Sequence, residues 1–487
     1  MTNQYDPGSD RAEAFINDAE IRDTLEYAEA NAGDAALIGE ILAKAATCAG
    51  LTHREAATLL LCGDAETDLR VKRLAAEIKE RFYGSRIVMF APLYLSNYCV
   101  NGCVYCPYQS GNRHMPRRKL TQDEIRRETI ALQDMGHKRL ALELGEDPIR
   151  NPIEYVLESI DTIYGVRHRN GAIRRVNVNI AATCADNYRR LADAGIGTYI
   201  LFQETYHKEK YESLHPTGPK RNYAYHTEAP DRAMDGGIDD IGLGVLFGLE
   251  MYKYDFVGLL MHAEHLEAAK GVGPHTISVP RIRPADGVDV ANFKDAVPDD
   301  VFERIVALLR ISVPYTGLIM STRESQTMRE RALGLGISQL SGASKTSVGG
   351  YGTDWFDADV RGGDTLGAET EDTAQFDTSD NRSLDRVVGW LTDLGYIPSF
   401  CTACYREGRT GDRFMELVKS GRIADCCQPN ALMTLKEYLE DYASPDTRTK
   451  GLALIAKEVK KIPSPEVRGI AEAYLSELDG GRRDFRF

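Results

Sequence analysis

Three cysteines lie within eight residues of the segment "YCVNGCVYCPY", residues 98–108. Cys99, Cys103 and Cys106 form the pattern C-x3-C-x2-C, and no fourth cysteine or histidine stands nearby at zinc-finger spacing. Three thiolates cannot close a tetrahedral structural zinc site, and ferredoxins supply four cysteines per cluster. The pattern therefore favours a 4Fe–4S cluster with one open iron, which could chelate the amino and carboxylate groups of a small ligand.

A second cysteine triad lies near the C-terminus. Cys401 and Cys404 are followed, after 22 intervening residues, by Cys427. The adjacent Cys426 would make that gap 21 residues, so the spacing alone leaves the third ligand open. A zinc site completed by another residue is the alternative. We favour a second three-cysteine iron–sulfur cluster, because the chain already carries one such triad.

Composition excludes several classes of function. The chain has 487 residues and a net charge of −14, and it has no basic stripe, so we expect no nucleic-acid partner. It contains no apolar run of 18 residues, so we expect no membrane span. The polar, acidic start "MTNQYDPGSDRAEAF" does not resemble a signal peptide. We therefore expect a cytoplasmic protein whose thiols stay reduced.

The elements that must position the first triad form a repeating pattern. Short apolar, β-branched runs alternate with amphipathic helical stretches, which indicates repeated βα units and a parallel sheet. Eight such runs favour a closed (β/α)8 barrel, an α/β fold. The predicted strands are 86–97, 139–148, 174–182, 197–205, 240–249, 276–285, 315–324 and 336–344.

The pattern divides the chain into four parts. Residues 1–84 read as helices, for example at "LTHREAATLLL", which opens with a threonine N-cap. Residues 85–350 form the barrel, and 351–382 form an acidic, Gly/Thr-rich loop or insertion. Residues 383–487 are mostly helical and carry the second triad.

Polar side chains follow several predicted strands at the point where each strand ends. Barrels keep their active sites at the C-terminal ends of their strands. Any one of these positions is more often a turn or a cap, but their recurrence favours a site there. The residues are Glu146, Asn177, Asn179, Gln203, Glu204 and Arg323.

The first triad, with Tyr105 just before its last cysteine, resembles that of the radical SAM enzymes. In that family the open iron holds S-adenosylmethionine (SAM), and one electron releases a 5′-deoxyadenosyl radical from it. The resemblance implies that Gly145 and Glu146 hold the methionine ammonium, although Leu144 replaces the first glycine of the family's Gly-Gly-Glu motif. It also suggests that Asn177 and Asn179 reach the ribose hydroxyls.

Longer stretches are similar to the HydG family of FeFe-hydrogenase maturases. They include "FAPLYLSNYCVNGCVYC", "GVGPHTISVPRIRP" and "CTACYREGRTGDRFM", and the similarity runs from about residue 15 to the end. The resemblance implies an anaerobic lyase that breaks the Cα–Cβ bond of L-tyrosine to give p-cresol and dehydroglycine. The glycine fragment then yields carbon monoxide and cyanide, assembled as an Fe(CO)2(CN)–cysteine unit for the hydrogenase active site.

The resemblance also assigns roles to residues. Cys99, Cys103 and Cys106 would hold the SAM-binding cluster, and an auxiliary 4Fe–4S cluster with an additional iron would take Cys401, Cys404 and Cys427. Arg323 would bind the tyrosine carboxylate, while Gln203 and Glu204 would contact SAM or tyrosine. For the non-cysteine ligand of the additional iron we favour His265, with His275 second.

The same resemblance names partners and leaves two other functions open. L-tyrosine and L-cysteine would be small-molecule ligands, and the protein partners would be hydrogenase maturation proteins and an electron donor such as ferredoxin or flavodoxin. A thiamine-pathway tyrosine lyase (2-iminoacetate synthase) would share the barrel and the first triad but lack the second. A non-catalytic iron–sulfur scaffold would need no SAM-binding motif.

Overall fold

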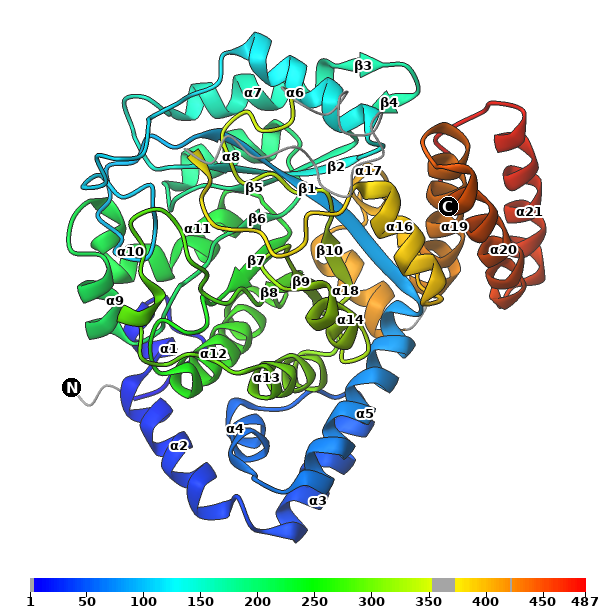
Figure 1. The fold of residues 1–487 in the computed structure, drawn as a ribbon. Coiled ribbons are helices and arrows are strands. Elements are labelled where there is room, and N and C mark those ends of the chain that lie inside the picture. The colour runs from blue at the N-terminus through cyan, green and yellow to red at the C-terminus, as the bar shows by residue number, and fades with distance from the viewer. Residues whose placement is uncertain (1–3, 353–372, 421–422) are drawn as a thin grey trace.

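Eight parallel strands close into a barrel, because the last of them, β10, pairs again with the first, β1 (Figure 1). The structure is a computed structural model that describes residues 4–352, 373–420 and 423–487. The predicted (β/α)8 barrel is therefore confirmed. In their order around the barrel the strands are β1 (Arg86–Ser96), β2 (Arg139–Leu144), β5 (Arg175–Asn179), β6 (Tyr199–Ile200), β7 (Ile241–Gly244), β8 (Thr276–Ser278), β9 (Gly317–Met320) and β10 (Gln339–Ser341).

The barrel strands are apolar because both of their faces are covered. In β1 the side chains of Ile87, Met89, Ala91 and Leu93, which share one face, have no exposed surface, and Tyr94 on the other face is only 3% exposed. Side chains on one face fill the barrel, and those on the other pack under the surrounding helices. Each strand lies inside a run predicted from the sequence, but the observed strands are shorter. A small antiparallel hairpin, β3 (Arg167–His168) and β4 (Gly171–Ala172), was not predicted.

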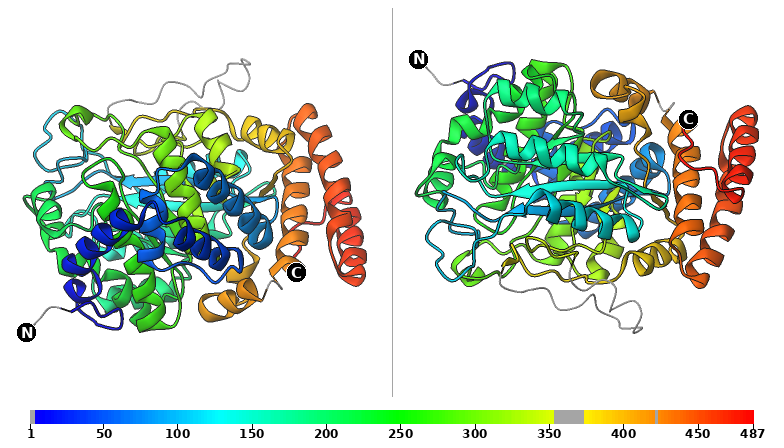
Figure 2. Two further views of the ribbon diagram at one scale, coloured as in Figure 1. Left: turned by 90° about the horizontal axis from the view of Figure 1, so that it is seen from below. Right: turned by 90° about the horizontal axis from the view of Figure 1, so that it is seen from above.

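Helices surround the barrel on the outside, as the two views in Figure 2 show. The first of them, α6, begins with a reciprocal capping box between Thr121 and Glu124, which ends the long loop after β1. The helices that follow the strands are α6 (Gln122–Asp134), α7 (Ile153–Gly165), α8 (Ala185–Asp193), α9 (Lys208–Leu214), α10 (Tyr223–Thr227), α11 (Ala229–Asp235), α12 (Tyr252–Lys270), α13 (Asp299–Ser312) and α14 (Gln326–Leu333).

The N-terminal segment is helical, as predicted, and packs beneath α12 and α13 (Figure 1). The expected N-cap is present, because Thr52 and Glu55 form a capping box at the start of α4. The segment comprises α1 (Ala12–Phe15), α2 (Asp18–Asn31), α3 (Ala35–Ala46), α4 (His53–Leu61) and α5 (Ala65–Tyr83).

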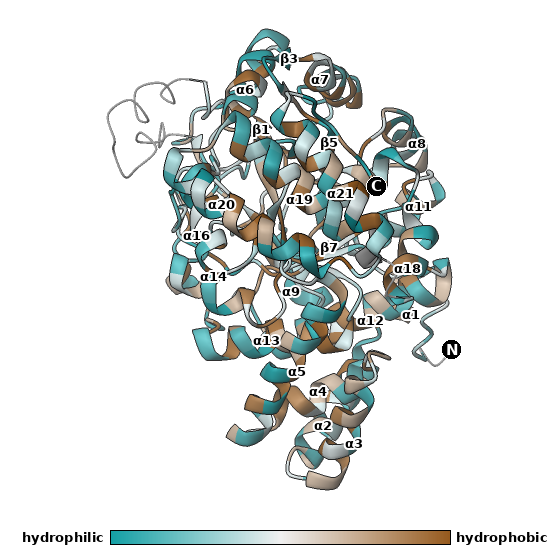
Figure 3. Ribbon diagram, turned by 90° about the vertical axis from the view of Figure 1, so that its right-hand side faces the viewer, coloured by the Kyte–Doolittle hydropathy of each residue, from teal (hydrophilic) through white to brown (hydrophobic). Residues whose placement is uncertain are grey.

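The C-terminal segment adds a strand and a helical layer. Strand β11 (Ile397–Ser399) runs parallel to the start of β1, with Ile397 paired to Arg86. Helix α19 packs on β11, α20 and α21, and these three helices cover one side of the barrel (Figure 3). The helices are α16 (Leu384–Asp393), α17 (Ala403–Arg406), α18 (Gly411–Lys419), α19 (Ile423–Asp441), α20 (Pro445–Glu458) and α21 (Pro465–Asp479).

The two cysteine triads lie at opposite ends of β1. The first follows Ser96, the last residue of that strand, whereas the second follows β11, whose Ser399 pairs with Val88 near its beginning. The eight residue-to-residue steps from Val88 to Ser96 span roughly 26 Å at about 3.3 Å per step. The barrel interior therefore separates two distinct sites.

Two further expectations concern the whole chain. The predicted acidic loop at 351–382 falls largely on residues 353–372, which lie outside the described residues. Within the described ranges, no helix combines the length and the apolar character needed to cross a membrane.

Candidate functional site

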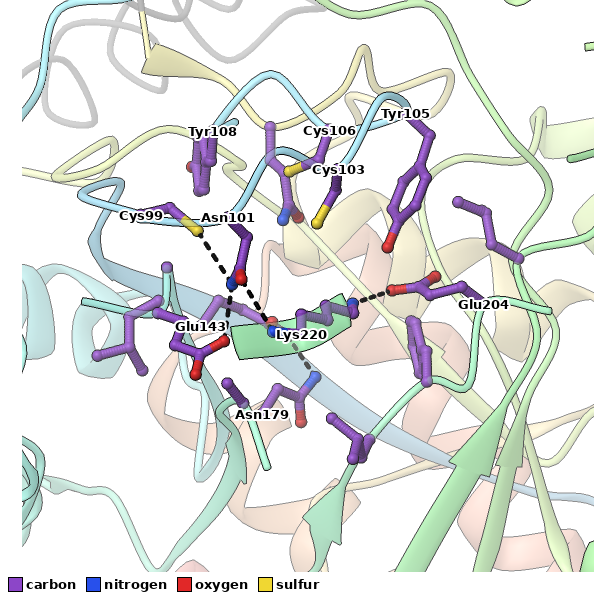
Figure 4. A pocket seen from close by; sticks show the side chains of 18 of the residues that line it. Cys99, Asn101, Cys103, Tyr105, Cys106, Tyr108, Glu143, Asn179, Glu204 and Lys220 are labelled. Atoms are coloured by element: carbon purple, nitrogen blue, oxygen red, sulfur yellow. Dashed lines mark hydrogen bonds and ion pairs between the residues drawn. The ribbon is translucent and has the colours of Figure 1, made fainter. Parts of the chain in front are cut away.

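The first triad lies on the loop between β1 and α6 and lines a cavity of about 180 Å³ (Figure 4). Buried hydrogen bonds shape this loop. The guanidinium of Arg117 donates hydrogen bonds to the carbonyl oxygens of Asn97, Tyr108 and Gln109 at 2.6–2.8 Å. This one side chain therefore links the start of the loop to the segment that follows the cysteines. Tyr105 also lines the cavity, and its hydroxyl lies 2.6 Å from Nε2 of His215.

Gly145 and Glu146 lie beside the first triad, as the sequence predicted. A Cβ atom at position 145 would lie 2.5 Å from the carbonyl oxygen of Tyr98 and 2.9 Å from Cβ of Cys99, so only glycine fits against the loop. The Glu146 carboxylate accepts a hydrogen bond of 2.7 Å from Nδ2 of Asn101. Burial raises the pKa of Glu146, so a cation bound at this edge would stabilise its charge.

An ion pair that the sequence reasoning missed closes the other side of the cavity. Nζ of Lys220 lies 2.7 Å from the Glu204 carboxylate, and both side chains are largely buried. The backbone N–H of Lys220 also donates to Oδ1 of Asn101, which ties this segment to the cysteine loop. Figure 4 shows Lys220, Glu204 and Asn101 below the three thiols. The predicted Glu204 is therefore in the cavity, whereas Lys220 lies in a polar loop with no periodic signal.

A second cavity of about 90 Å³ continues into the barrel. Arg323, Glu143 and Asn179 line both cavities. Arg323 lies over the ring of Phe376 at 3.5 Å from its centroid, and within the described ranges no carboxylate forms an ion pair with it. The neighbouring acid, Glu324, pairs with Arg281 and Arg283 instead. The guanidinium of Arg323 therefore faces the cavity without an ion-pair partner among the described residues.

Glu143 is a second residue that sequence reasoning missed. Nδ2 of Asn179 donates to its carboxylate at 2.6 Å. Burial raises the pKa of Glu143 to about 8, although the nearby charge of Arg323 opposes the shift. The alternation of inward-facing residues along β2 could have indicated it, since Glu143 interrupts the apolar run "RLALEL".

Two predicted residues do not line these cavities as expected. Asn177 lies deeper in the barrel than Asn179 and lines only the second cavity, where its Oδ1 accepts hydrogen bonds from Arg175 and from the backbone of Thr198. Gln203 lines neither cavity, because its side chain donates to the hydroxyl of Thr227. This placement gives no support to the predicted contacts of Asn177 with ribose and of Gln203 with SAM or tyrosine.

The second triad lines a cavity of about 80 Å³ at the opposite end of the barrel. Cys401, Cys404 and Cys427 all face it, whereas Cys426 is not among its lining residues. Arg139 also lines the cavity and donates a hydrogen bond of 3.0 Å to the carbonyl oxygen of Cys401. The geometry thus selects Cys427 over Cys426 as the third thiol of this site.

The histidine at this second site is His275, not His265. The His275 ring lines the cavity, and its Nε2 is hydrogen-bonded to the Tyr405 hydroxyl at 2.6 Å. His265 lies on α12 outside the barrel, where its ring bonds to the carbonyl oxygen of Pro7 at 2.7 Å and to the Asp231 carboxylate at 3.0 Å. The prediction that His265 binds an iron beside Cys401 is therefore wrong, because α12 turns it toward the N-terminal segment.

The donor sets fit iron–sulfur clusters. Within the described ranges, no three cysteine, histidine or carboxylate side chains are gathered closely enough to bind a single metal ion. A cubane is larger, and each cysteine binds a different iron atom, so it requires a wider spacing. Burial raises the pKa of Cys103 and Cys106, so a bound metal would be needed to keep these thiols as thiolates.

Comparisons with known proteins agree with this geometry. Residues 93–262 match the Radical SAM superfamily and residues 278–397 match the Biotin and Thiamin Synthesis associated domain. The 2-iminoacetate synthase of Escherichia coli (strain K12) is 30% identical over 326 residues, which cover 66% of this chain and 80% of that protein.

Two solved structures are similar along nearly the whole chain. The crystal structure of HydG, a maturase of the FeFe-hydrogenase, is 49% identical with a TM-score of 0.91, and the match covers 97% of this chain and all of that one. The FeFe-hydrogenase maturase HydG from Carboxydothermus hydrogenoformans is 37% identical with a TM-score of 0.81, over 95% of this chain and 99% of that one. The chain therefore belongs to the radical SAM superfamily and, within it, to the HydG family of FeFe-hydrogenase maturases.

Proposed function

We propose that this protein is a radical SAM tyrosine lyase that makes the diatomic ligands of a hydrogenase cofactor. Cys99, Cys103 and Cys106 hold a 4Fe–4S cluster, and Gly145 and Glu146 bind the amino group of SAM at its open iron. Gly145 lets the end of β2 pack closely against the cysteine loop, and the Glu146 carboxylate pairs with the ammonium. When bound and reduced, this cluster and SAM supply a 5′-deoxyadenosyl radical that takes a hydrogen from the amino group of L-tyrosine.

The substrate L-tyrosine occupies the cavity deeper in the barrel. Arg323 binds its carboxylate through the guanidinium fork, since no carboxylate among the described residues forms an ion pair with this cation. Burial lowers the pKa of Arg323, and a bound carboxylate would stabilise the charged form. Glu143 lies beside Arg323 in the same cavity and is available for the ammonium of the amino acid. Cleavage of the Cα–Cβ bond then gives p-cresol and dehydroglycine.

Enclosure is the contribution of the surrounding chain. Ile200, Phe202 and Phe376 line both cavities, and these apolar side chains keep water away from the reacting atoms. The Lys220–Glu204 pair and the cysteine loop cover the end of the barrel above them. A reactive intermediate therefore meets the substrate rather than solvent.

The second triad serves a separate assembly step. Cys401, Cys404 and Cys427 would hold an auxiliary 4Fe–4S cluster, and His275 would be the protein ligand of an additional iron. Bound there, that iron would supply the coordination sites for carbon monoxide, cyanide and L-cysteine. Gln339 lines both the second cavity and the cavity of the second triad. Products of the first site would pass Gln339 through the barrel interior. We assign this step to residues 383–487 together with the barrel residues 85–350 that face them.

One observation carries the proposal: two cysteine-lined cavities lie at opposite ends of one barrel, and the cavity between them is lined by Arg323, with which no carboxylate of the described residues forms an ion pair. The test is anaerobic incubation of the reconstituted protein with SAM, dithionite and L-tyrosine, followed by assay of 5′-deoxyadenosine, p-cresol, carbon monoxide and cyanide. We expect all four products from the native chain. The Cys103→Ser variant should make none of them, and the matched Cys404→Ser variant should still make 5′-deoxyadenosine and p-cresol.

Other outcomes would favour the alternatives. p-Cresol without carbon monoxide or cyanide from the native chain would favour a 2-iminoacetate synthase, the activity of the Escherichia coli relative. Absence of both 5′-deoxyadenosine and p-cresol, with two clusters present, would favour a scaffold.

A further inference from the structure

The loop of the first triad turns its thiols inward and their neighbours outward. Cys103 is 6% exposed, whereas the adjacent Val104 is 39% exposed and Val100, next to Cys99, is 37% exposed. The loop is therefore a single layer of chain between the first cavity and the surface. Ile149 is 90% exposed, the highest value for a large apolar side chain in the described ranges.

Three segments meet on this outer face. The N–H of Val100 donates to the carbonyl oxygen of Glu146, and the guanidinium of Arg150 lies 4.3 Å from the ring centroid of Tyr98, so the segment with Ile149 borders the cysteine loop. On the other side, Gly102 donates its N–H to the carbonyl oxygen of Thr217. The resulting surface, here called the docking patch, comprises Val100, Val104, Ile149, Arg150 and Arg221.

The exposed charges of the docking patch are positive. No aspartate or glutamate occurs from residue 97 to 122 or from 213 to 227, although the chain as a whole carries a net charge of −14. Arg150 is 57% exposed, and Arg221 is exposed. Asp147 is the nearby acid. Its side chain is only 12% exposed, accepts the backbone N–H groups of Ile149 and Arg150, and lies 3.9 Å from Nε of Arg150. The cation of this weak ion pair is therefore far more exposed than the acid.

We propose that the docking patch binds a small acidic one-electron carrier protein, such as a flavodoxin, that reduces the cluster of the first triad. The inference rests on the proposed function, which needs one electron at that cluster for each turnover. Electron tunnelling falls steeply with distance, and this patch is separated from the thiols only by their own loop. The net negative charge of the chain repels an acidic carrier elsewhere, so local cations would orient it here.

The test compares two reductants on the same variants. The Arg150→Glu/Arg221→Glu variant reverses both exposed charges, the Ile149→Ser variant removes the apolar contact, and Arg70→Glu on α5 is the matched control, since Arg70 is exposed on the N-terminal segment. Initial rates of 5′-deoxyadenosine formation are measured while photoreduced flavodoxin is titrated, and again with dithionite. Binding is measured separately by the fluorescence anisotropy of labelled flavodoxin.

We expect the double variant to raise the KM for flavodoxin about tenfold and to flatten its dependence on salt. Ile149→Ser should raise it several-fold, and Arg70→Glu should leave it unchanged. Dithionite-driven rates should stay within about twofold of the native rate. A native KM for flavodoxin in both patch variants would overturn the proposal, as would equal losses with both reductants in Ile149→Ser. If the native chain cleaved no SAM with dithionite, the proposed function would fail, while the anisotropy arm would still decide whether flavodoxin binds the patch.

Discussion

Gln339 on β10 lines both the second cavity, to which we assign L-tyrosine in the proposed function, and the cavity of the second triad, so its size should control the transfer of small products between them. The two cavities have volumes of about 90 and 80 Å³. Gln339→Phe adds two heavy atoms, which fill on the order of 50 Å³ given that one water occupies about 30 Å³. That volume is more than half of the cavity beside Cys401. Overpacking should cost about 1–3 kcal/mol, which a barrel of this size tolerates.

The expected result is a separation of the two activities. The Gln339→Phe variant should form p-cresol within about twofold of the native rate, because the residues around Arg323 are unchanged. Cyanide and carbon monoxide bound to iron should fall at least tenfold, and free cyanide in solution should rise. The assay is quantification of p-cresol, free cyanide and the infrared bands of iron-bound diatomic ligands. Gln339→Met, of similar size, is the control for loss of the amide.

Native amounts of iron-bound product from Gln339→Phe would refute a route past Gln339. A parallel fall in p-cresol and iron-bound product would instead show that the substitution damages the first site, and the route would lose its support.

Three further predictions concern buried polar groups. His275→Ala should lose the additional iron and keep both clusters. His265→Ala should keep that iron but lower the unfolding free energy by about 1–3 kcal/mol, because it removes hydrogen bonds to Asp231 and Pro7. Iron analysis and denaturant unfolding distinguish the two variants. Glu143→Gln should leave stability unchanged near pH 4 and be increasingly stabilising from pH 5 to 8. Between these pH values the native Glu143 ionises in the unfolded chain but stays protonated in the folded one, where its pKa is raised to about 8, so the native fold loses stability as the pH rises. The gain in unfolding free energy, measured across this pH range, should reach a few kcal/mol at about 1.4 kcal/mol per unit of pKa shift. Lys220→Met should destabilise the protein by about 3–5 kcal/mol, because it leaves Glu204 buried and unpaired. The double variant Lys220→Met/Glu204→Gln should recover most of this loss in denaturant unfolding.

Each of these has a contrary result. Loss of the additional iron in His265→Ala but not in His275→Ala would reverse the assignment of the ligand. A stability difference for Glu143→Gln that is independent of pH would show that its carboxyl does not titrate abnormally. A double variant as unstable as Lys220→Met alone would mean that the loss does not come from an unpaired Glu204 carboxylate.

The fold was readable from the sequence because strand burial leaves a strong pattern. All eight barrel strands are covered on both faces, so each appears as an apolar run, and the capping residues Thr52 and Thr121 mark helix starts. The cysteines and Gly145 were equally visible, since a triad and a motif are defined by spacing along the chain. The ends of the strands were placed less well, because polar strand ends and turns have similar composition.

The other site residues depend on how deep a side chain lies in the barrel and which way it points, and the spacing of residues along the sequence does not determine either. Asn177 and Asn179 lie on the same face of β5, but Asn177 lies deeper in the barrel, and its Oδ1 accepts a hydrogen bond from Arg175. His265 lies in the middle of a surface helix, whereas His275 directly precedes β8 and so lies at the end of the barrel where β8 begins. That position could have identified His275 from the predicted strands. Lys220 has no such signal, because it reaches the cavity from a single 3-10 turn, Pro219–Arg221, which is too short to leave a periodic pattern.

The central claim is that three thiols at positions 99–106 hold a 4Fe–4S cluster whose open iron binds SAM. Electron paramagnetic resonance of the dithionite-reduced Cys401→Ser/Cys404→Ser variant tests it most directly, because that variant retains only the first triad. The account predicts the signal of a single reduced 4Fe–4S cluster, changed in shape by added SAM. Zinc in place of iron at this triad, or a cluster signal that SAM leaves unaltered, would contradict it.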